Sequence, residues 1–518
     1  MPITRRSFLR AVAARGGNAY GAMLALDLLG PARASAFTLD GHGRGTSVAI
    51  LGAGVGGLCA AYELRKRGYT CTILEARSRP GGRAWTVRNG TTETELGGHT
   101  QTAKFGEGLW WNPGPSRVPQ HHVTIDYYRE LGVPIEVFTN VNENAYVYGT
   151  HAQPQRTRLR EAAYGLRGHV DELMAKAVAT DALDVAMSKD DRDKLLAYLR
   201  DDGGLNTSFT LAPADGRLGY RVNPGGGNQP GIANDPLGLR ALVESGFGRE
   251  TGFASELDQQ PTMFQPVGGI AALPHAFAAR LPGVIAYGAQ VQAIRKRGSG
   301  VRIAYRDAQG AERALDADYA ICTIPLSVLR SIPADWSPAM KAAIAAVPYA
   351  DVTKIGLEFK RRFWEEDDRI FGGITWTDQP ITQIWYPAWG YLGKSGILTG
   401  TYNFGKTALA MGKLSPAERL RAAIDQGAKI HPQYPHEFSR AFAVAWQNIP
   451  HNRGGWATYT VALRKTAYPT LMRPDGPIYL AGEHISYLTG WQAGALESAR
   501  QAVASINTRV QSEGASTT

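Results

Sequence analysis

The stretch Gly52-Ala53-Gly54-Val55-Gly56-Gly57 decides the fold of this 518-residue chain. It follows a short apolar run at 47–51 and precedes residues 58–68, whose composition predicts a helix. A second apolar run at 70–74 predicts the next strand, and Glu75 ends it. A strand, a glycine turn, a helix, a strand and an acid in this order predict the first βαβ unit of a dinucleotide-binding domain.

Each glycine of this turn has a physical role in such a unit. Gly52 permits the tight turn, Gly54 lets the backbone approach a pyrophosphate, and Gly57 lets the helix pack closely on the strand. The N-terminus of the helix then presents its partial positive charge to the phosphates. Glu75 follows roughly 20 residues on, where a carboxylate accepts hydrogen bonds from ribose hydroxyls.

A second glycine turn indicates FAD rather than NAD. In Pro80-Gly81-Gly82-Arg83, two glycines bring the backbone close to the cofactor, and Arg83 supplies a fixed cation for the pyrophosphate. Together with Leu74-Glu75-Ala76-Arg77, this stretch resembles the flavin amine oxidase superfamily. That superfamily includes monoamine and polyamine oxidases, L-amino acid oxidases and amino acid monooxygenases. The resemblance implies a two-domain FAD fold assembled from separated stretches of chain.

Later segments resemble further parts of the same FAD site. The resemblance implies that the backbone of Val291 pairs with adenine, that Glu483 binds the ribityl chain, and that the helix opening at 490–499 stabilises negative charge on the reduced flavin. No cysteine lies in this closing segment, so we expect non-covalent FAD. The candidate cofactor-binding residues are Gly52, Gly54, Gly56, Gly57, Glu75, Ala76, Arg77, Gly82, Arg83, Gly97, Gly98, Val291, Gly482, Glu483, Gly490, Trp491 and Gln492.

The predicted fold class is mixed α/β, with a Rossmann-like FAD-binding domain of the GR2 type interleaved with a β-sheet substrate domain. FAD-binding segments are expected at 45–105, 255–325 and 470–512, and substrate-domain segments at 106–150 and 326–469. Strand-like runs occur in the latter at 351–359 and 381–386. Residues 151–254 predict a helical insertion, with amphipathic helices at 158–177 and 189–200.

The N-terminal residues 1–36 are expected to be a leader. Thr4-Arg5-Arg6-Ser7-Phe8-Leu9-Arg10 resembles a twin-arginine export signal, and Ala32-Arg33-Ala34-Ser35-Ala36 offers small-residue cleavage sites. Arg15 and Asp27 interrupt the apolar stretch between them. A functional leader predicts a periplasmic or secreted protein, and a leader without function predicts a cytoplasmic one.

The residues that select the substrate are implied by the same resemblance. Arg117, in Gly114-Pro115-Ser116-Arg117-Val118-Pro119, matches the L-amino acid oxidase arginine that binds the substrate carboxylate, which suits a guanidinium fork. Tyr386 matches the tyrosine that makes the second carboxylate contact, and a one-residue shift would place Trp385 there instead. Lys354 matches a lysine that holds a water near the flavin, and Trp456 and Trp491 are candidate aromatic walls.

Composition and motifs exclude several other classes. The net charge of +10 comes from basic residues spread along the chain, so nucleic-acid binding is not expected. No run of about 18 uninterrupted apolar residues appears, so a stable membrane anchor is not expected either. His99, His121, His122 and His484 form no recognisable metal-ligand pattern, and no metal is expected. A homo-oligomer is compatible with the sequence.

The expected function is FAD-dependent oxidation of L-amino acids by O2, giving a 2-oxo acid, ammonia and hydrogen peroxide. Tryptophan-rich walls favour large apolar or aromatic side chains. An L-amino acid 2-monooxygenase, giving an amide, would use the same residues. An amine or polyamine oxidase is the other alternative, although it has no use for Arg117.

Overall fold

The computed structural model describes residues 37–212 and 216–515, so the predicted leader at 1–36 lies outside the described residues. One of the two main sheets of the molecule is parallel and five-stranded, with β1 at its centre. The strand order is β11 (Ile285–Tyr287), β2 (Thr70–Glu75), β1 (Ser47–Leu51), β15 (Tyr319–Cys322) and β21 (Ile478–Leu480). Four of the five residues of β1 are buried, as is typical of a parallel strand that is covered on both faces.

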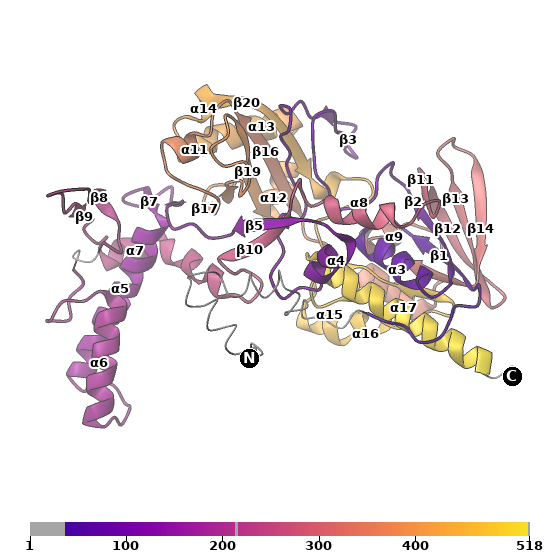
Figure 1. The fold of residues 1–518 in the computed structure, drawn as a ribbon, viewed down its shortest axis with the longest axis horizontal. Helices are drawn as coiled ribbons and strands as arrows, with labels where there is room; N and C mark the ends of the chain where they lie inside the picture. The colour runs from indigo at the N-terminus through magenta and orange to yellow at the C-terminus, as the bar shows by residue number, and fades with distance from the viewer. Residues whose placement is uncertain (1–36, 213–215, 516–518) are drawn as a thin grey trace, which may run out of the picture.

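Helices cover one face of this sheet and a small antiparallel sheet covers the other (Figure 1). On the helical face, α3 packs against the long C-terminal helix α17. The helices of this face are α3 (Val55–Arg65), α4 (Thr124–Leu131), α8 (Ala272–Ala279) and α17 (Gln492–Ala515). The opposite face carries β12 (Gln290–Arg297), β13 (Gly300–Arg306) and β14 (Glu312–Ala317).

The other main sheet has seven strands, and its strand β16 is buried along its whole length. Its neighbours pair antiparallel, except for β17 and β6, which are parallel. The order is β20 (Phe438–Ala445), β16 (Val352–Phe359), β19 (Gly396–Phe404), β18 (Gln383–Trp385), β17 (Ile374–Thr377), β6 (Tyr146–Tyr148) and β7 (Arg156–Arg158). The strands predicted at 351–359 and 381–386 are therefore confirmed.

A helical arm projects from the body of the molecule (Figure 1). Its two long helices, α5 (Leu159–Ala179) and α6 (Lys189–Gly203), confirm the helices predicted from the amphipathic pattern. Ser188 caps α6 by accepting a hydrogen bond from the backbone N–H of Asp191. The arm also contains β8 (Tyr220–Val222), β9 (Ile232–Ala233), α7 (Leu239–Ser245) and the 3₁₀ helix η2 (Phe247–Ser255).

The boundary expected at residue 325 is too early. Helices α9 (Leu326–Leu329) and α10 (Pro338–Ala346) pack in one apolar cluster with Leu51 and Cys322 of the parallel sheet, so the cofactor-side unit continues through them. The spacing of apolar residues in α10 predicts an amphipathic helix. It does not predict which of the two sheets the helix packs against, and for this reason the expected boundary is too early.

The remaining elements are β3 (Thr92–Thr94), β4 (Thr100–Thr102), β5 (Ile135–Thr139), β10 (Thr262–Pro266), α11 (Phe363–Glu366), α12 (Gly405–Gly412), α13 (Pro416–Gly427), α14 (Tyr434–Glu437), η3 (Trp446–Asn448), α15 (Val461–Lys465), α16 (Ala467–Leu471) and η4 (Glu483–Ile485). Within the described ranges, no helix has both the length and the apolar character needed to cross a bilayer.

Candidate active site

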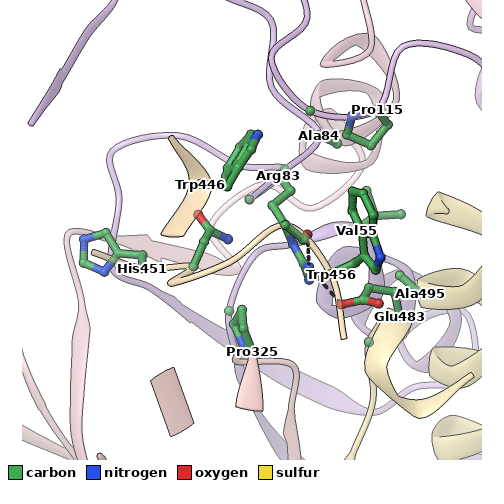
Figure 2. Close-up of a pocket in the computed structure, with 18 of the residues that line it drawn as sticks. Val55, Arg83, Ala84, Pro115, Pro325, Trp446, His451, Trp456, Glu483 and Ala495 are labelled. Atoms are coloured by element: carbon green, nitrogen blue, oxygen red, sulfur yellow. Dashed lines mark hydrogen bonds and ion pairs between the residues drawn. The ribbon is translucent and has the colours of Figure 1, made fainter. Parts of the chain in front are cut away.

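A cavity of about 740 Å³ runs from the parallel sheet to the seven-stranded sheet. One end is lined by Gly54 and Glu75, and the other by Arg117, Lys354 and Trp385. The close-up in Figure 2 shows Arg83, Trp456 and Glu483 around its middle. One cavity thus joins the predicted dinucleotide segments to the predicted substrate residues.

The glycine turn between β1 and α3 leaves its end of the cavity open. Gly52 has a φ of +105°, and no atom lies within 4 Å of a Cβ built on Gly54. A Cβ on Gly57 would lie 2.0 Å from the carbonyl oxygen of Gly52, so this glycine is required for packing of the helix on the strand and does not line the cavity. Helix α3 begins here without a side-chain cap or an acid in its first turn, which leaves its N-terminus available to an anion.

The buried carboxylate of Glu75 is held in place by the backbone. It accepts hydrogen bonds from the N–H groups of Ala53 at 2.7 Å and Arg77 at 2.9 Å. Since these donors fix its orientation, Glu75 is placed to accept from the hydroxyls of a ribose at this end of the cavity.

A nearly buried ion pair joins the two distant cofactor segments. Nη1 of Arg83 lies 2.8 Å from Oε1 of Glu483 and also donates to the carbonyl oxygen of Gly455 at 2.7 Å (Figure 2). Burial lowers the pKa of Arg83, but the charge of Glu483 outweighs it and holds that pKa above the usual value. Both partners line the cavity, so the pair places one cation and one anion in its wall.

The N-terminus of α17 provides an unused donor. Gln492, its first residue, lines the cavity, and its Nε2 atom is buried without a hydrogen-bond partner. The open glycine turn, the oriented carboxylate of Glu75 and this donor fit an elongated anionic dinucleotide. Arg83 would hold its phosphates, Glu75 its ribose, and Gln492 its far end.

At the opposite end, Arg117 is a buried cation without an anionic partner. Its guanidinium lies 4.2 Å from the centre of the Trp385 ring, and Nη2 donates to the neutral amide oxygen of Gln259 at 2.6 Å. The Nε atom is buried without a partner, and burial lowers the pKa of Arg117 to about 10. Across the part of the chain that the structure describes, no ion pair includes Arg117. The site is therefore suited to a carboxylate supplied by a ligand.

Lys354 lies in the same part of the cavity. Its Nζ atom donates to the carbonyl oxygen of Gly114 at 2.8 Å and lies 3.4 Å from Oγ of Ser116. Burial, together with the nearby charge of Arg117, holds the pKa of Lys354 well below its usual value. A buried lysine of this kind can position a water or serve as a neutral donor.

The position predicted for Tyr386 is wrong. Its hydroxyl lies 2.7 Å from Thr375 and 2.6 Å from Nε2 of His431, within the apolar core of the seven-stranded sheet. Trp385, the last residue of β18, lines the cavity, while Tyr386, the next residue along the chain, packs in the core instead. Because successive side chains of a strand alternate between faces, a one-residue shift in the assignment moves the side chain out of the site.

Tyr402 is the cavity tyrosine that the sequence did not reveal. Tyr402 is the cross-strand partner of Lys354 in the pairing of β16 with β19. The Nζ atom of Lys354 lies 4.0 Å from the centre of the Tyr402 ring. Burial raises the pKa of Tyr402 to about 12, so its hydroxyl stays protonated and can donate to an anion. Only the strand register, which no local signal in the sequence encodes, places Tyr402 beside Lys354.

Two predicted cofactor residues also lie elsewhere. Gly97 and Gly98 are exposed at the turn between β3 and β4, and neither lines the cavity. A backbone hydrogen bond from Glu95 to the carbonyl of His99 closes this turn, so the pair of glycines serves a hairpin and not a cofactor.

The other predicted residues line the cavity together, and a few residues that were not predicted join them. Phe253 lies in η2 at the end of the helical arm, Gln259 follows it in the chain, and both face Arg117. The predicted residues found there are Gly52, Gly54, Gly56, Glu75, Ala76, Arg77, Gly82, Arg83, Arg117, Val291, Lys354, Trp456, Gly482, Glu483, Gly490, Trp491 and Gln492.

With this geometry established, the class of protein follows from comparison with known families. The chain belongs to the flavin-containing amine oxidoreductases, whose family model matches residues 55–507. It is thus an oxidoreductase of a family that uses a flavin cofactor, and the parallel sheet with its glycine turn is the fold that this family shares.

Two curated relatives and one solved structure are similar to this chain over most of its length. The chain is 29% identical over 496 residues to the flavin-dependent L-tryptophan oxidase RebO of Lentzea aerocolonigenes, which covers 89% of this chain and 97% of the relative. It is 27% identical over 486 residues to the L-amino-acid oxidase of Siganus canaliculatus, with 89% and 85% covered. A triple mutant of putrescine oxidase matches the fold with a TM-score of 0.61 at 19% identity, covering 90% of this chain and 99% of that one.

Proposed function

We propose that this protein is an FAD-dependent L-amino acid oxidase. The observation that carries the proposal is the buried guanidinium of Arg117, which lies in the flavin-side cavity without an anionic partner. A buried cation is costly unless a ligand neutralises it, and a substrate carboxylate does so with charge-assisted hydrogen bonds. A simple amine would leave that charge uncompensated. The curated relatives named as L-amino-acid and L-tryptophan oxidases support the same choice.

The residues of this chain bind and orient the amino acid. Arg117 donates two parallel hydrogen bonds to the carboxylate, and the hydroxyl of Tyr402 and the amine of Lys354 are the further donors at that end of the cavity. A flavin held here would supply the acceptor for a hydride from Cα and the route for its electrons to O2, and water would hydrolyse the resulting imino acid, so that the overall products would be a 2-oxo acid, ammonia and hydrogen peroxide. The aromatic residues around the cavity restrict the access of water and hold the substrate for this transfer.

The substrate side chain is proposed to be large and apolar or aromatic. Phe253, Trp385, Tyr402 and Trp491 surround Arg117 and offer flat apolar surface. Among the described residues, the acids that line the cavity are Glu75 and Glu483, both in the cofactor segments, so no acid beside these rings favours a basic side chain.

FAD is proposed to bind without a covalent link. The three cysteines of the chain, Cys59, Cys71 and Cys322, are all described, buried and absent from the cavity lining. Denaturation by acid should therefore release free flavin, and flavin that stays on the denatured chain would contradict non-covalent binding.

One experiment tests the proposed function. The purified holoprotein is offered a panel of L-amino acids and the corresponding decarboxylated amines, and both peroxide and the carbon product are followed. Peroxide with a 2-oxo acid supports the proposal. An amide product would identify a 2-monooxygenase, and a preference for the amines would identify an amine oxidase.

A further inference from the structure

Beside the proposed substrate site, two adjacent histidines and a distant aspartate meet. The Nε2 atoms of His121 and His122 lie 3.1 Å and 2.9 Å from the same oxygen, Oδ1 of Asp258. All three ligand atoms lie within 4.8 Å of one another. The histidines alone formed no ligand pattern in the sequence, because their third partner is far along the chain.

We propose that His121, His122 and Asp258 bind a divalent transition-metal ion next to the active-site cavity. Two imidazoles and one carboxylate suit Zn²⁺, Co²⁺ or Ni²⁺, whereas Mg²⁺ and Ca²⁺ prefer all-oxygen sites. Bonds of 2.0–2.2 Å in a tetrahedral arrangement place neighbouring ligand atoms about 3.3 Å apart. The two observed nitrogen–oxygen distances are close to that spacing. The two imidazole nitrogens lie within 4.8 Å of each other, and rotation of the more exposed His121 ring would bring them closer and so complete the site. Water would take the remaining position.

The three ligands differ in their exposure to solvent, and this leaves the site open to an incoming ion. His121 is 39% exposed and Asp258 30% exposed, while His122 is only 2% exposed. An ion can therefore enter from solvent and bind against one rigid, buried ligand.

The position of this site links it to the substrate end of the cavity. Asp258 directly precedes Gln259, which accepts a hydrogen bond from Arg117. The ring of His122 lies edge-on to Trp491, with 5.2 Å between ring centres. A bound ion would tie the segment that carries Gln259 to the segment that carries Arg117, and it would fix one face of Trp491.

Direct metal binding to the holoprotein tests this inference. The protein is dialysed against a chelator, then against buffer with Zn²⁺ or with Mg²⁺, and the metal per chain is measured by mass spectrometry and by calorimetric titration. We expect one Zn²⁺ per chain, little Mg²⁺, and a higher Tm with Zn²⁺. Asp258→Asn and His122→Gln should each weaken Zn²⁺ binding at least about tenfold, the size of loss seen even for residues that only support metal ligands.

Matched controls separate the site from general surface binding. Asp126→Asn changes a carboxylate on the adjacent helix α4, and His99→Ala removes an exposed histidine from a distant hairpin. Both should bind Zn²⁺ as the parent does, and all variants should retain their flavin absorbance. Equal Zn²⁺ binding by parent and Asp258→Asn, substoichiometric Zn²⁺ in the parent, or equal binding of Mg²⁺ would overturn the inference. Because this measurement needs no turnover, its failure would leave the proposed oxidase function untouched.

Discussion

Arg117 and Gln259 are hydrogen-bonded in the substrate cavity: Nη2 of the guanidinium donates to the amide oxygen at a distance of 2.6 Å. A neutral oxygen thus lies where the proposed substrate carboxylate would bind. The pairing satisfies one donor of the buried cation without neutralising it, so an incoming carboxylate gains the stronger, charge-assisted bond.

Arg117→Ala should lower kcat/KM for L-amino acids by roughly 30- to 3,000-fold. Truncating one partner of a buried charge pair costs on the order of 2–5 kcal/mol, and about 1.4 kcal/mol corresponds to tenfold. Arg117→Lys should recover only part of the loss, because an ammonium lacks the fork. Steady-state kinetics check this, with exposed Arg295→Ala as the control. Near-parental kinetics in Arg117→Ala would remove the arginine from substrate binding.

Gln259→Glu should raise KM for L-amino acids about tenfold, with a smaller effect on kcat. The new carboxylate would pair with Arg117 and compete with the substrate, and a charge-assisted bond exceeds a neutral one by about 1.4 kcal/mol. Gln259→Ala is the matched control, because it removes the amide without adding an anion and should not raise KM in this way. If Gln259→Glu has parental KM, Gln259 does not compete for the carboxylate position.

Glu483→Ala should lower both flavin content and stability. The substitution leaves Arg83 buried without its partner at the centre of the cavity, and breaking a buried pair costs on the order of 3–5 kcal/mol. The ratio of flavin to protein absorbance and urea unfolding measure the two effects. Glu483→Gln keeps the shape and one hydrogen-bonding oxygen of the side chain, so its flavin content and stability should lie between those of the parent and Glu483→Ala. Exposed Glu312→Ala should match the parent. Full flavin content in Glu483→Ala would contradict this role.

The stability of the parent relative to Lys354→Met should increase with pH. Burial lowers the folded-state pKa of Lys354, whereas the unfolded chain has a value of about 10.4, so the unfolded state binds more protons between the two. The free energy of unfolding of the parent, relative to the variant, should therefore rise by up to about 1.4 kcal/mol per pH unit across that window. Urea unfolding between neutral pH and pH 10 measures this slope. A flat or falling difference would mean that Lys354 is charged in the folded protein.

We further propose that the leader at residues 1–36 directs export, and that export requires Arg5 and Arg6 together. Replacing both with lysine should leave the protein in the cytoplasm, because a receptor reads the pair and not its charge. Fractionation of cells that produce the parent or the variant checks this. Unchanged partitioning would show that the leader is not an address.

The cofactor half of the molecule could be predicted well because its signals are local. A glycine at positive φ, such as Gly52, and one that meets a neighbouring backbone, such as Gly57, are required by geometry within a few residues of each other. The run from Ser47 to Glu75 is therefore enough to predict the βαβ unit that it forms. Gly98 shows the limit of the same reasoning, since its φ of +80° serves the turn of a hairpin and not a cofactor.

The sequence by itself determined the class of fold and the glycine turn that opens it, because each depends on a short pattern whose residues act on their immediate neighbours. Its resemblance to a known family, and not a local pattern, pointed to Arg117. The tertiary structure alone decided which strand face meets the cavity, and so replaced Tyr386 with Trp385 and added Tyr402 through the register of β16 and β19. It also brought Asp258 to His121 and His122 across more than a hundred residues of chain. Pairing register and the meeting of distant segments are set by packing of the whole core, and the period-two alternation of a strand turns a one-residue difference into an opposite face.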